Sequence, residues 1–367
     1  MAFASKFNML KNELKSIQVL RALAVILVVM FHFRFDADAI ITNSQVVFAN
    51  GSIGVDLFFV ISGFIIYYVT DNNKHGVHES IVFIIKRISR VAPPYYIISV
   101  LFAYFYTGDY SDLFNSFLFL PKTIYEAPFF GYPSLVVGWS LNYEMYFYIA
   151  TAVGISILSK IRWPIILSLM MAPIICMALY YGNISLSSAF IYTTKYPYLS
   201  MISNPIIIDF ALGVFCGWMT KKDYCLSDKF VVTMSILIFM IVYIGISRSE
   251  HGPIVWGAAS LLITFSFVEL EKRKLIYLPK TMIYIGNISF SIYLIHIPAL
   301  KIILYIFNTY TPTFNMTLRP ECLFLSALLL TAIMSLGYHY IVEKTLCDTL
   351  RKIMLFIIYK TKRESIP

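Results

Sequence analysis

Long apolar stretches constrain the fold of this chain more than any other feature. A helix of about 20 apolar residues spans the roughly 30 Å hydrocarbon layer of a bilayer. Stretches of this kind recur through most of the 367 residues, interrupted in places by Pro or Gly. They fall near residues 17–35, 53–70, 92–106, 135–158, 163–181, 201–219, 229–247, 253–269, 281–307 and 321–342. The sequence therefore predicts an all-α polytopic membrane bundle of about ten transmembrane helices.

The overall composition excludes an ordinary soluble domain. Apolar residues make up 59% of the chain and charged residues only 13%, whereas about a quarter of the residues in a typical soluble domain are charged. A membrane bundle presents its apolar side chains to lipid and needs no charged shell. The sequence indicates an integral membrane protein, with lipid as one of its partners.

Neither the charge nor the cysteines indicate a nucleic-acid or metal site. The net charge is +9, but the Lys and Arg residues lie in short clusters between apolar stretches, which is typical of a topology signal and not of a nucleic-acid surface. The five cysteines are scattered and never stand in a CxxC spacing. We therefore expect no nucleic acid, no disulfide framework and no metal.

The positions of the basic residues predict the orientation of the bundle, because cytoplasmic loops are enriched in Lys and Arg. If the N-terminus is cytoplasmic and the ten segments alternate, all but six of the 29 basic residues fall on the cytoplasmic side. The six are Arg34, Lys122, Lys195, Arg248, Lys301 and Arg319. The sequence predicts that both termini are cytoplasmic, in a multi-pass protein of the inner (cytoplasmic) membrane.

Two segments outside the predicted spans differ from the rest of the chain in composition. Residues 107–134 form the longest outer segment and are aromatic and acidic, which favours a lid or a re-entrant cap. Residues 344–363 alternate basic and apolar side chains, as an interfacial helix does. We therefore predict a transmembrane domain over residues 1–343 and a basic cytoplasmic tail over residues 344–367.

The first predicted helix carries two ionisable residues, Arg21 and His32, at a spacing of eleven. Eleven residues are about three helical turns, or about 16.5 Å of rise, so both side chains lie on one face. Ionisable groups inside a membrane span are functional by default. The alternative is that each is a boundary residue, with Arg21 at the inner interface and His32 at the outer one.

Two carboxylates are predicted in the outer halves of other spans. Asp56 stands near the start of the second span and needs a partner, which a histidine at the same depth, such as His32, could provide. Glu144 follows Ser140 by four residues and precedes Tyr148 by four, so the three form one polar stripe on the fourth span. Asp209 is a further buried acid with no evident partner.

Arg87 and Arg90 end the inner loop that precedes the third predicted span. Two arginines one turn apart can bind phosphate groups through bidentate hydrogen bonds. Composition alone favours the alternative, an ordinary cytoplasmic loop.

Six motifs, in order along the chain, resemble those of the acyltransferase 3 family of multi-span enzymes. They are Arg21-x10-His32, the stretch from Gly54 to Phe64, Arg87-x-x-Arg90, Trp139-Ser140-Leu141-x-x-Glu144, the stretch from Ser289 to His296, and Tyr338-His339-Tyr340-x-x-Glu343. The resemblance implies a ten-helix fold and transfer of an acyl group, usually acetyl, from CoA to an acceptor hydroxyl. It implies acetyl-CoA as the donor substrate and a surface polysaccharide or lipid-linked glycan as the acceptor.

A mechanism can be formulated on these residues. An acceptor alcohol needs a base, and a neutral imidazole serves as one at neutral pH. We hypothesise that His32 deprotonates the acceptor and is oriented by Asp56 or Glu144, as a carboxylate orients the histidine of a catalytic triad. Arg87 and Arg90 would bind the CoA phosphates, and Arg21 would line the path of the pantetheine arm. The sequence leaves open whether transfer is direct or passes through an acyl group on His32.

One competing class is a non-enzymatic transporter or flippase of lipid-linked sugars, whose midplane site would also use buried His, Arg and Glu. The chain has no recognisable repeated halves, and a carrier has no need for a pair of cytoplasmic arginines. Within the enzyme class, a peptidoglycan sugar or a small metabolite could be the acceptor, and succinyl could replace acetyl.

Overall fold

A computed structural model describes residues 14–70, 74–107, 110–157, 161–192, 194–222, 228–245, 250–313 and 320–364. Some residues used in the charge count and the cysteine pattern lie outside these ranges, namely Lys6, Lys11, Lys160, Cys225, Arg248 and Arg319.

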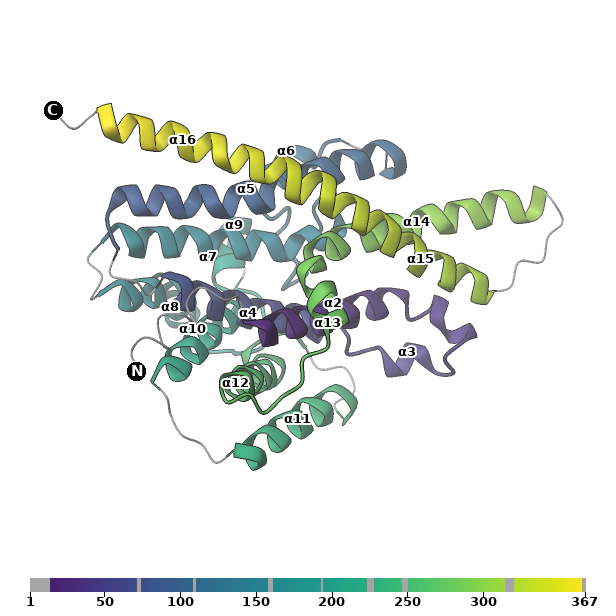
Figure 1. The fold of residues 1–367 in the computed structure, drawn as a ribbon, viewed down its shortest axis with the longest axis horizontal. Helices are drawn as coiled ribbons and strands as arrows, with labels where there is room; N and C mark the ends of the chain where they lie inside the picture. Colours follow the sequence, from purple (N-terminus) through teal and green to yellow (C-terminus); the bar gives the residue numbers. More distant parts are fainter. Residues whose placement is uncertain are drawn as a thin grey trace.

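Every regular element in the described ranges is helical (Figure 1). The long helices are α2 (Lys15–Phe33), α4 (Ile53–Thr70), α5 (Val77–Phe102), α7 (Trp139–Ser156), α8 (Arg162–Tyr181), α10 (Ile208–Lys221), α11 (Asp228–Gly245), α12 (Ala258–Lys272), α14 (Ser289–Thr313), α15 (Pro320–Tyr338) and α16 (Asp348–Glu364). The short elements are η1 (Asp36–Ala39), α3 (Ser44–Val47), η2 (Ala103–Thr107), α6 (Leu113–Phe117), η3 (Val136–Gly138), α9 (Pro197–Ile202), η5 (Pro205–Ile207), η6 (Pro253–Gly257), α13 (Lys280–Asn287) and η7 (His339–Cys347). The all-α prediction is confirmed.

Seven helical stretches among the described residues are long and apolar enough to cross a membrane. The chain is therefore a multi-pass membrane protein. The predicted segments 135–158, 201–219 and 229–247 correspond to α7, to the pair α9 and α10, and to α11, which are not among the seven. Helix α7 is less apolar because it carries the stripe that begins at Ser140 and lines a cavity, described below. The count of ten and the cytoplasmic termini stay predictions.

Hydrogen bonds join the ends of helices that lie far apart in the sequence. Glu271, at the end of α12, accepts hydrogen bonds from the backbone N–H groups of Lys15 and Ser16, at 2.9 and 2.8 Å. A carboxylate at this position satisfies free N–H groups of the first turn of α2. At the opposite end, the Asn50 side chain donates to the Tyr243 carbonyl at 2.7 Å. We call the end with Glu271 the proximal end and the end with Asn50 the distal end.

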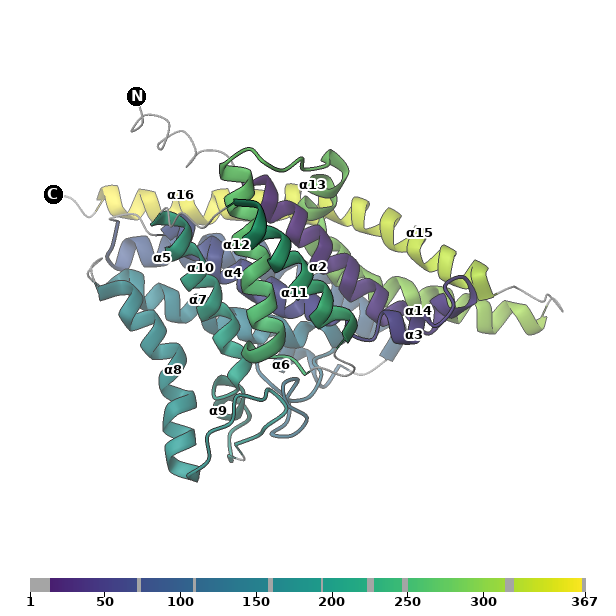
Figure 2. The same cartoon turned by 90° about the horizontal axis from the view of Figure 1, so that it is seen from below.

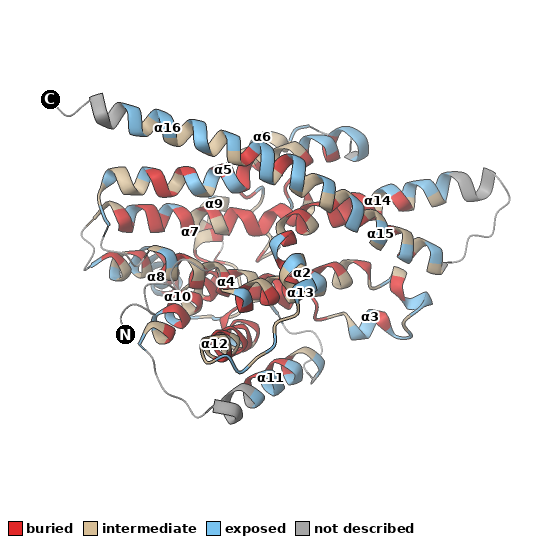
Figure 3. Cartoon of the chain, viewed as in Figure 1, coloured by how far each residue is buried: buried red, intermediate tan, exposed pale blue. Residues whose placement is uncertain are grey.

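Helices α2, α4 and α7 form the middle of the molecule, and most of their side chains are buried (Figure 3). Helix α4 also crosses α10 at very short range, because glycine stands at the crossing on both sides. A Cβ atom on Gly63 would lie 2.1 Å from the Phe210 carbonyl oxygen, and one on Gly213 would lie 2.0 Å from that of Val60. Small residues permit such close approach of membrane helices.

The prediction that Arg87 and Arg90 lie in a loop is wrong, because α5 begins at Val77 and includes both. The helix continues through Pro93 and Pro94. The sequence prediction began this span only at residue 92, because residues 77–91 include Glu79, Lys86 and the two arginines. They are nonetheless held in the bundle, since α5 packs against α7 on one side and α16 on another.

The two segments outside the predicted spans also contain regular elements. Within residues 107–134 the chain forms α6 and then an irregular turn with left-handed backbone at Glu126 and Phe130. At the other end of the sequence, the π-helical η7 joins α15 to α16 across residues 343 and 344. Helix α16 lies alongside α5 (Figures 1 and 2). The domain boundary at residue 343 stays a prediction.

Candidate active site

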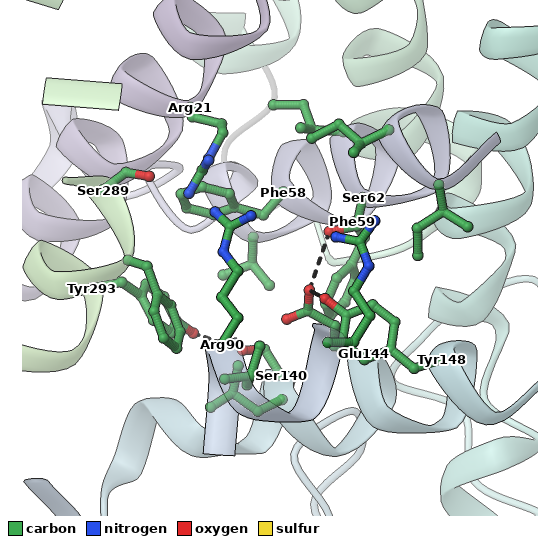
Figure 4. A pocket seen from close by; sticks show the side chains of 18 residues that line it. Arg21, Phe58, Phe59, Ser62, Arg90, Ser140, Glu144, Tyr148, Ser289 and Tyr293 are labelled. Carbon is green, nitrogen blue, oxygen red and sulfur yellow. Dashed lines mark hydrogen bonds between the residues drawn. The ribbon is translucent and has the colours of Figure 1, made fainter. Parts of the chain in front are cut away.

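Among the cavities lined by described residues, three lie one after another, and the middle one contains most of the predicted polar residues. It has about 820 Å³ of empty space, open solvent at its mouth included. Its polar lining comes from α2, α4, α5, α7 and α14 and includes Arg21, Ser62, Arg87, Arg90, Ser140, Glu144, Tyr148, Ser289 and Tyr293 (Figure 4). Residues from nearly the whole length of the chain therefore meet in one chamber.

Three arginines enter the middle cavity. Arg21 and Arg90 extend into it from α2 and α5 (Figure 4). The Arg87 guanidinium lies 5.7 Å from the centre of the Tyr148 ring, within range of a cation–π interaction. Three guanidinium groups beside a single carboxylate make this cavity suited to an anionic ligand. The predicted arginines are thus brought together.

Glu144 is the carboxylate of the middle cavity. Its Oε1 atom accepts hydrogen bonds from Ser62 Oγ at 3.4 Å and from the Tyr148 hydroxyl. The stripe of Ser140, Glu144 and Tyr148 lines the cavity as one face of α7, which confirms the predicted periodicity. The prediction that Glu144 lies beside His32 is wrong, because Glu144 faces the arginines.

The proximal cavity is larger, at about 2080 Å³ of empty space, and opens beside η7 and α16. Its lining includes five cations and two carboxylates, namely Arg21, Arg87, Arg90, Lys344, Arg351, Glu343 and Asp348. Glu343 accepts hydrogen bonds from Ser291 Oγ and, at 3.1 Å, from His339 Nδ1. The predicted motif at the end of the sequence therefore forms part of this wall.

The distal cavity, with about 1120 Å³ of empty space, open solvent included, contains His32. Its walls include several aromatic rings, with Phe129 and Tyr132 from the predicted cap and Trp139 and Trp256 from the bundle. The cap segment therefore covers this cavity in part, as expected. The His32 ring lies 5.1 Å from the His296 ring, centre to centre.

Asp56 does not orient His32, which corrects the second part of the predicted arrangement. Asp56 is fully buried, and its Oδ2 atom lies 2.7 Å from Nδ1 of His251. Its Oδ1 atom accepts a hydrogen bond from the backbone N–H of Gly252 at 2.8 Å. In the described part of the chain, His32 forms no hydrogen bond with Asp56 or Glu144. The sequence predicted correctly that Asp56 and Glu144 lie in the interior, but their hydrogen-bond partners are not His32.

His251 is the residue that sequence reasoning missed. It precedes η6 in a short segment at the distal end, belongs to none of the six motifs, and lines the distal cavity together with Glu250. A signal was present in the sequence, since a histidine beside Gly252 and Pro253 at the end of a predicted span is well placed to face a ligand. The Asp209 carboxyl group lies close to that of Asp56, the partner of His251.

The three cavities share walls in sequence from one end to the other. Arg21, Arg87 and Arg90 line both the proximal and the middle cavity. Val55 and Tyr293 line both the middle and the distal cavity. A cationic chamber is thus separated from an aromatic, histidine-containing chamber by a few side chains.

Comparison with known families identifies this arrangement. A family model described as an acyltransferase domain matches residues 14–339, which include all six predicted site residues. The chain belongs to the acyltransferase 3 family. Acyltransferase 3 membership implies acyltransferase activity and confirms the resemblance found in the motifs.

Among curated relatives, a protein described as exopolysaccharide production protein ExoZ, from Rhizobium meliloti (strain 1021), is similar to this chain over most of its length. It is 26% identical over 269 residues, which cover 70% of this chain and 78% of the relative. No solved structure matches the chain.

Proposed function

We propose that the protein transfers an acetyl group from cytoplasmic acetyl-CoA to a hydroxyl group of a surface polysaccharide or of its lipid-linked precursor. The observation that carries the proposal is the series of three cavities with shared walls. A donor bound at one end and an acceptor bound at the other can then meet across Val55 and Tyr293.

The proximal cavity suits the donor. CoA carries several phosphate groups, and Arg, Lys and their charge-assisted hydrogen bonds are the usual protein partners of phosphate. Five cations against two carboxylates leave a positive excess in this cavity. We propose that Arg87 and Arg90 hold the phosphates and that Arg21 lines the path of the pantetheine arm toward the middle cavity.

The distal cavity suits a glycan acceptor. Aromatic faces such as those of Tyr132 and Trp139 pack against the apolar C–H face of a sugar ring, and Glu250 offers carboxylate oxygens to its hydroxyl groups. The relative from Rhizobium meliloti is described as acting in exopolysaccharide production, which supports the same acceptor class.

We propose that His32 is the imidazole that meets the acetyl group in the distal cavity. It lies at the end of α2 opposite Arg21, and it lines this cavity. Two routes through His32 are chemically complete. In one it is the base for the acceptor hydroxyl, and in the other its ring carries the acetyl group transiently.

The proposal is tested with membranes from cells that make the protein, because such membranes supply their own acceptor. Radiolabelled acetyl-CoA is added, and label is measured in the extracted lipids and polysaccharide. We expect incorporation that requires the protein, with stoichiometric release of CoA. A transporter or flippase of lipid-linked sugars would release no CoA, and that result would overturn the proposal.

A further inference from the structure

His251 is held in place by contacts to both its backbone and its ring. Its Nδ1 atom lies 2.7 Å from Asp56 Oδ2, and the second oxygen of that carboxylate is fixed by the Gly252 N–H group at 2.8 Å. Ser188 Oγ donates a hydrogen bond to the His251 carbonyl oxygen. A ring anchored in this way has one orientation.

Aromatic rings enclose the imidazole. The Trp256 ring stands nearly perpendicular to it, with its centre 5.0 Å away, and the Trp139 ring is inclined to it by 67°, with its centre 5.5 Å away. Phe129, from the cap segment, stands perpendicular to it at 6.2 Å. The imidazole is therefore surrounded by aromatic rings. The local dielectric constant there is low, so a hydrogen bond to a buried carboxylate is strong.

The hydrogen bond to Asp56 determines which ring nitrogen is free. A carboxylate accepts hydrogen bonds, so Nδ1 carries the proton and the lone pair of the neutral ring lies on Nε2. In the described part of the chain Nε2 has no hydrogen-bond partner, and the His251 ring lines the distal cavity. Nε2 is therefore the basic atom available to a ligand in that cavity.

His32 lines the same cavity, but its ring is not oriented in this way. Its ring packs against the Phe31 and His296 rings, each with its centre 5.1 Å away, and no carboxylate among the described residues is hydrogen-bonded to it. A histidine that serves as a base is normally oriented by a third group. Of the two imidazoles in the distal cavity, His251 is the one arranged as a base.

We propose that His251, oriented by Asp56, is the general base that deprotonates the acceptor hydroxyl. This inference rests on the proposed function. The acceptor oxygen bonds to the acyl carbon while its proton moves to Nε2 of His251. The bond from the acyl carbon to its carrier, the CoA sulfur or a nitrogen of His32, breaks, and the departing atom takes that proton from Nε2. The imidazole is thereby regenerated, and Asp56 is a positioning residue.

The test uses membranes that contain the native acceptor, with the variants His251→Gln and Asp56→Asn. Loss of general-base catalysis lowers a rate by about 10²–10⁴-fold, so we expect His251→Gln to incorporate labelled acetyl at least about a hundredfold more slowly. Acetyl-CoA binding by the purified variant, measured by equilibrium dialysis, should equal that of the wild type. The matched control is His78→Gln, since His78 lies near the start of α5 and lines none of the three cavities.

Rescue by free imidazole separates a chemical role from a structural one. His251→Gly leaves the space of the imidazole ring empty among the aromatic rings. Added imidazole should restore incorporation of labelled acetyl in that variant but not in His32→Gly. Asp56→Asn keeps the size of the side chain. It tests the same proposal if the His251 variants fold poorly and little protein is obtained. We expect it to slow incorporation without weakening acetyl-CoA binding.

The outcomes distinguish the two proposals. A wild-type protein that incorporates no label overturns the proposed function, and the base assignment with it. Wild-type incorporation together with unimpaired His251→Gln or Asp56→Asn overturns the base assignment alone. A folded, inactive His251→Gly that imidazole does not restore would also overturn it and assign the ring a structural role.

Discussion

The hydroxyl groups of Ser140 and Tyr293 lie 2.8 Å apart and join α7 to α14 beside the boundary of the middle and distal cavities. The Tyr293 hydroxyl also donates a hydrogen bond to the Val137 carbonyl, at 2.9 Å. Tyr293 and Val55 are the two residues that line both cavities. In the proposed reaction the acyl group passes between these two residues on its way from donor to acceptor. A larger side chain at this position should therefore block transfer.

Val55→Phe should block transfer without preventing donor binding. Val55 is buried and lines both cavities, and the larger ring would fill the space between them. We expect acetyl-CoA binding to persist while incorporation of label falls. Val153→Phe, on an exposed position of α7, is the control for the size of the substitution. Normal incorporation by a folded Val55→Phe protein would show that the acyl group takes another path.

His32→Ala should abolish transfer, because with His251 as the base the remaining role of His32 is to carry the acetyl group. We expect a loss of at least about 10²-fold, and His32→Gln should be equally inactive because an amide side chain cannot carry the acetyl group as an imidazole does. Label incorporation by membranes with equal amounts of protein measures this. A His32→Ala protein that inserts correctly and transfers acetyl normally would refute the assignment.

Arg87→Ala and Arg90→Ala should weaken donor binding. Each substitution removes charge-assisted hydrogen bonds to phosphate that contribute about 1.5–3 kcal/mol, which corresponds to a roughly tenfold to hundredfold higher KM for acetyl-CoA. The kcat value should change much less. Lys222→Ala is a suitable control, because Lys222 lies near the proximal end but lines none of the three cavities. A collapse of kcat with constant KM would remove the arginines from the donor site.

Gly63→Ala should destabilise the protein, because α4 and α10 must separate to admit the new methyl group. The Cβ atom would lie 2.1 Å from the Phe210 carbonyl oxygen, and overpacking of this kind costs about 1–3 kcal/mol. We expect a lower Tm in detergent. Gly337→Ala, where a Cβ atom meets nothing within 4 Å, should leave Tm unchanged or raise it. Equal Tm values for both variants would contradict the close crossing.

Periodicity within single helices was the part of the site that sequence could predict. Ser140, Glu144 and Tyr148 were expected on one face of a helix, and they line one cavity. Arg21 and His32 were expected at opposite ends of the same face, and they line the proximal and distal cavities. Both predictions require only the 3.6-residue repeat of a helix.

Partners between helices could not be predicted in the same way. Asp56 and His251 are 195 positions apart, and their contact depends on how α4, α10 and η6 pack around each other. Estimated depth in the membrane suggested His32 as the partner of Asp56, but depth does not specify which side of a helix faces which neighbour. The start of α5 was missed for a related reason. Its residues 77–91 include several charged side chains, and the apolar ones among them, such as Val82, Phe83 and Ile85, are buried in a helix that packs against α7 and α16.

Sidedness tests the central claim most directly. The described Lys and Arg residues concentrate at the proximal end, so we propose that this end is cytoplasmic and that the donor binds there. In sealed vesicles of known orientation, acetyl-CoA should be consumed only when it is supplied to the proximal face, and labelled acetyl should appear on acceptor confined to the opposite face. Acceptor acetylated only on the face that received acetyl-CoA, across a barrier shown to be tight, would contradict transfer through the series of cavities.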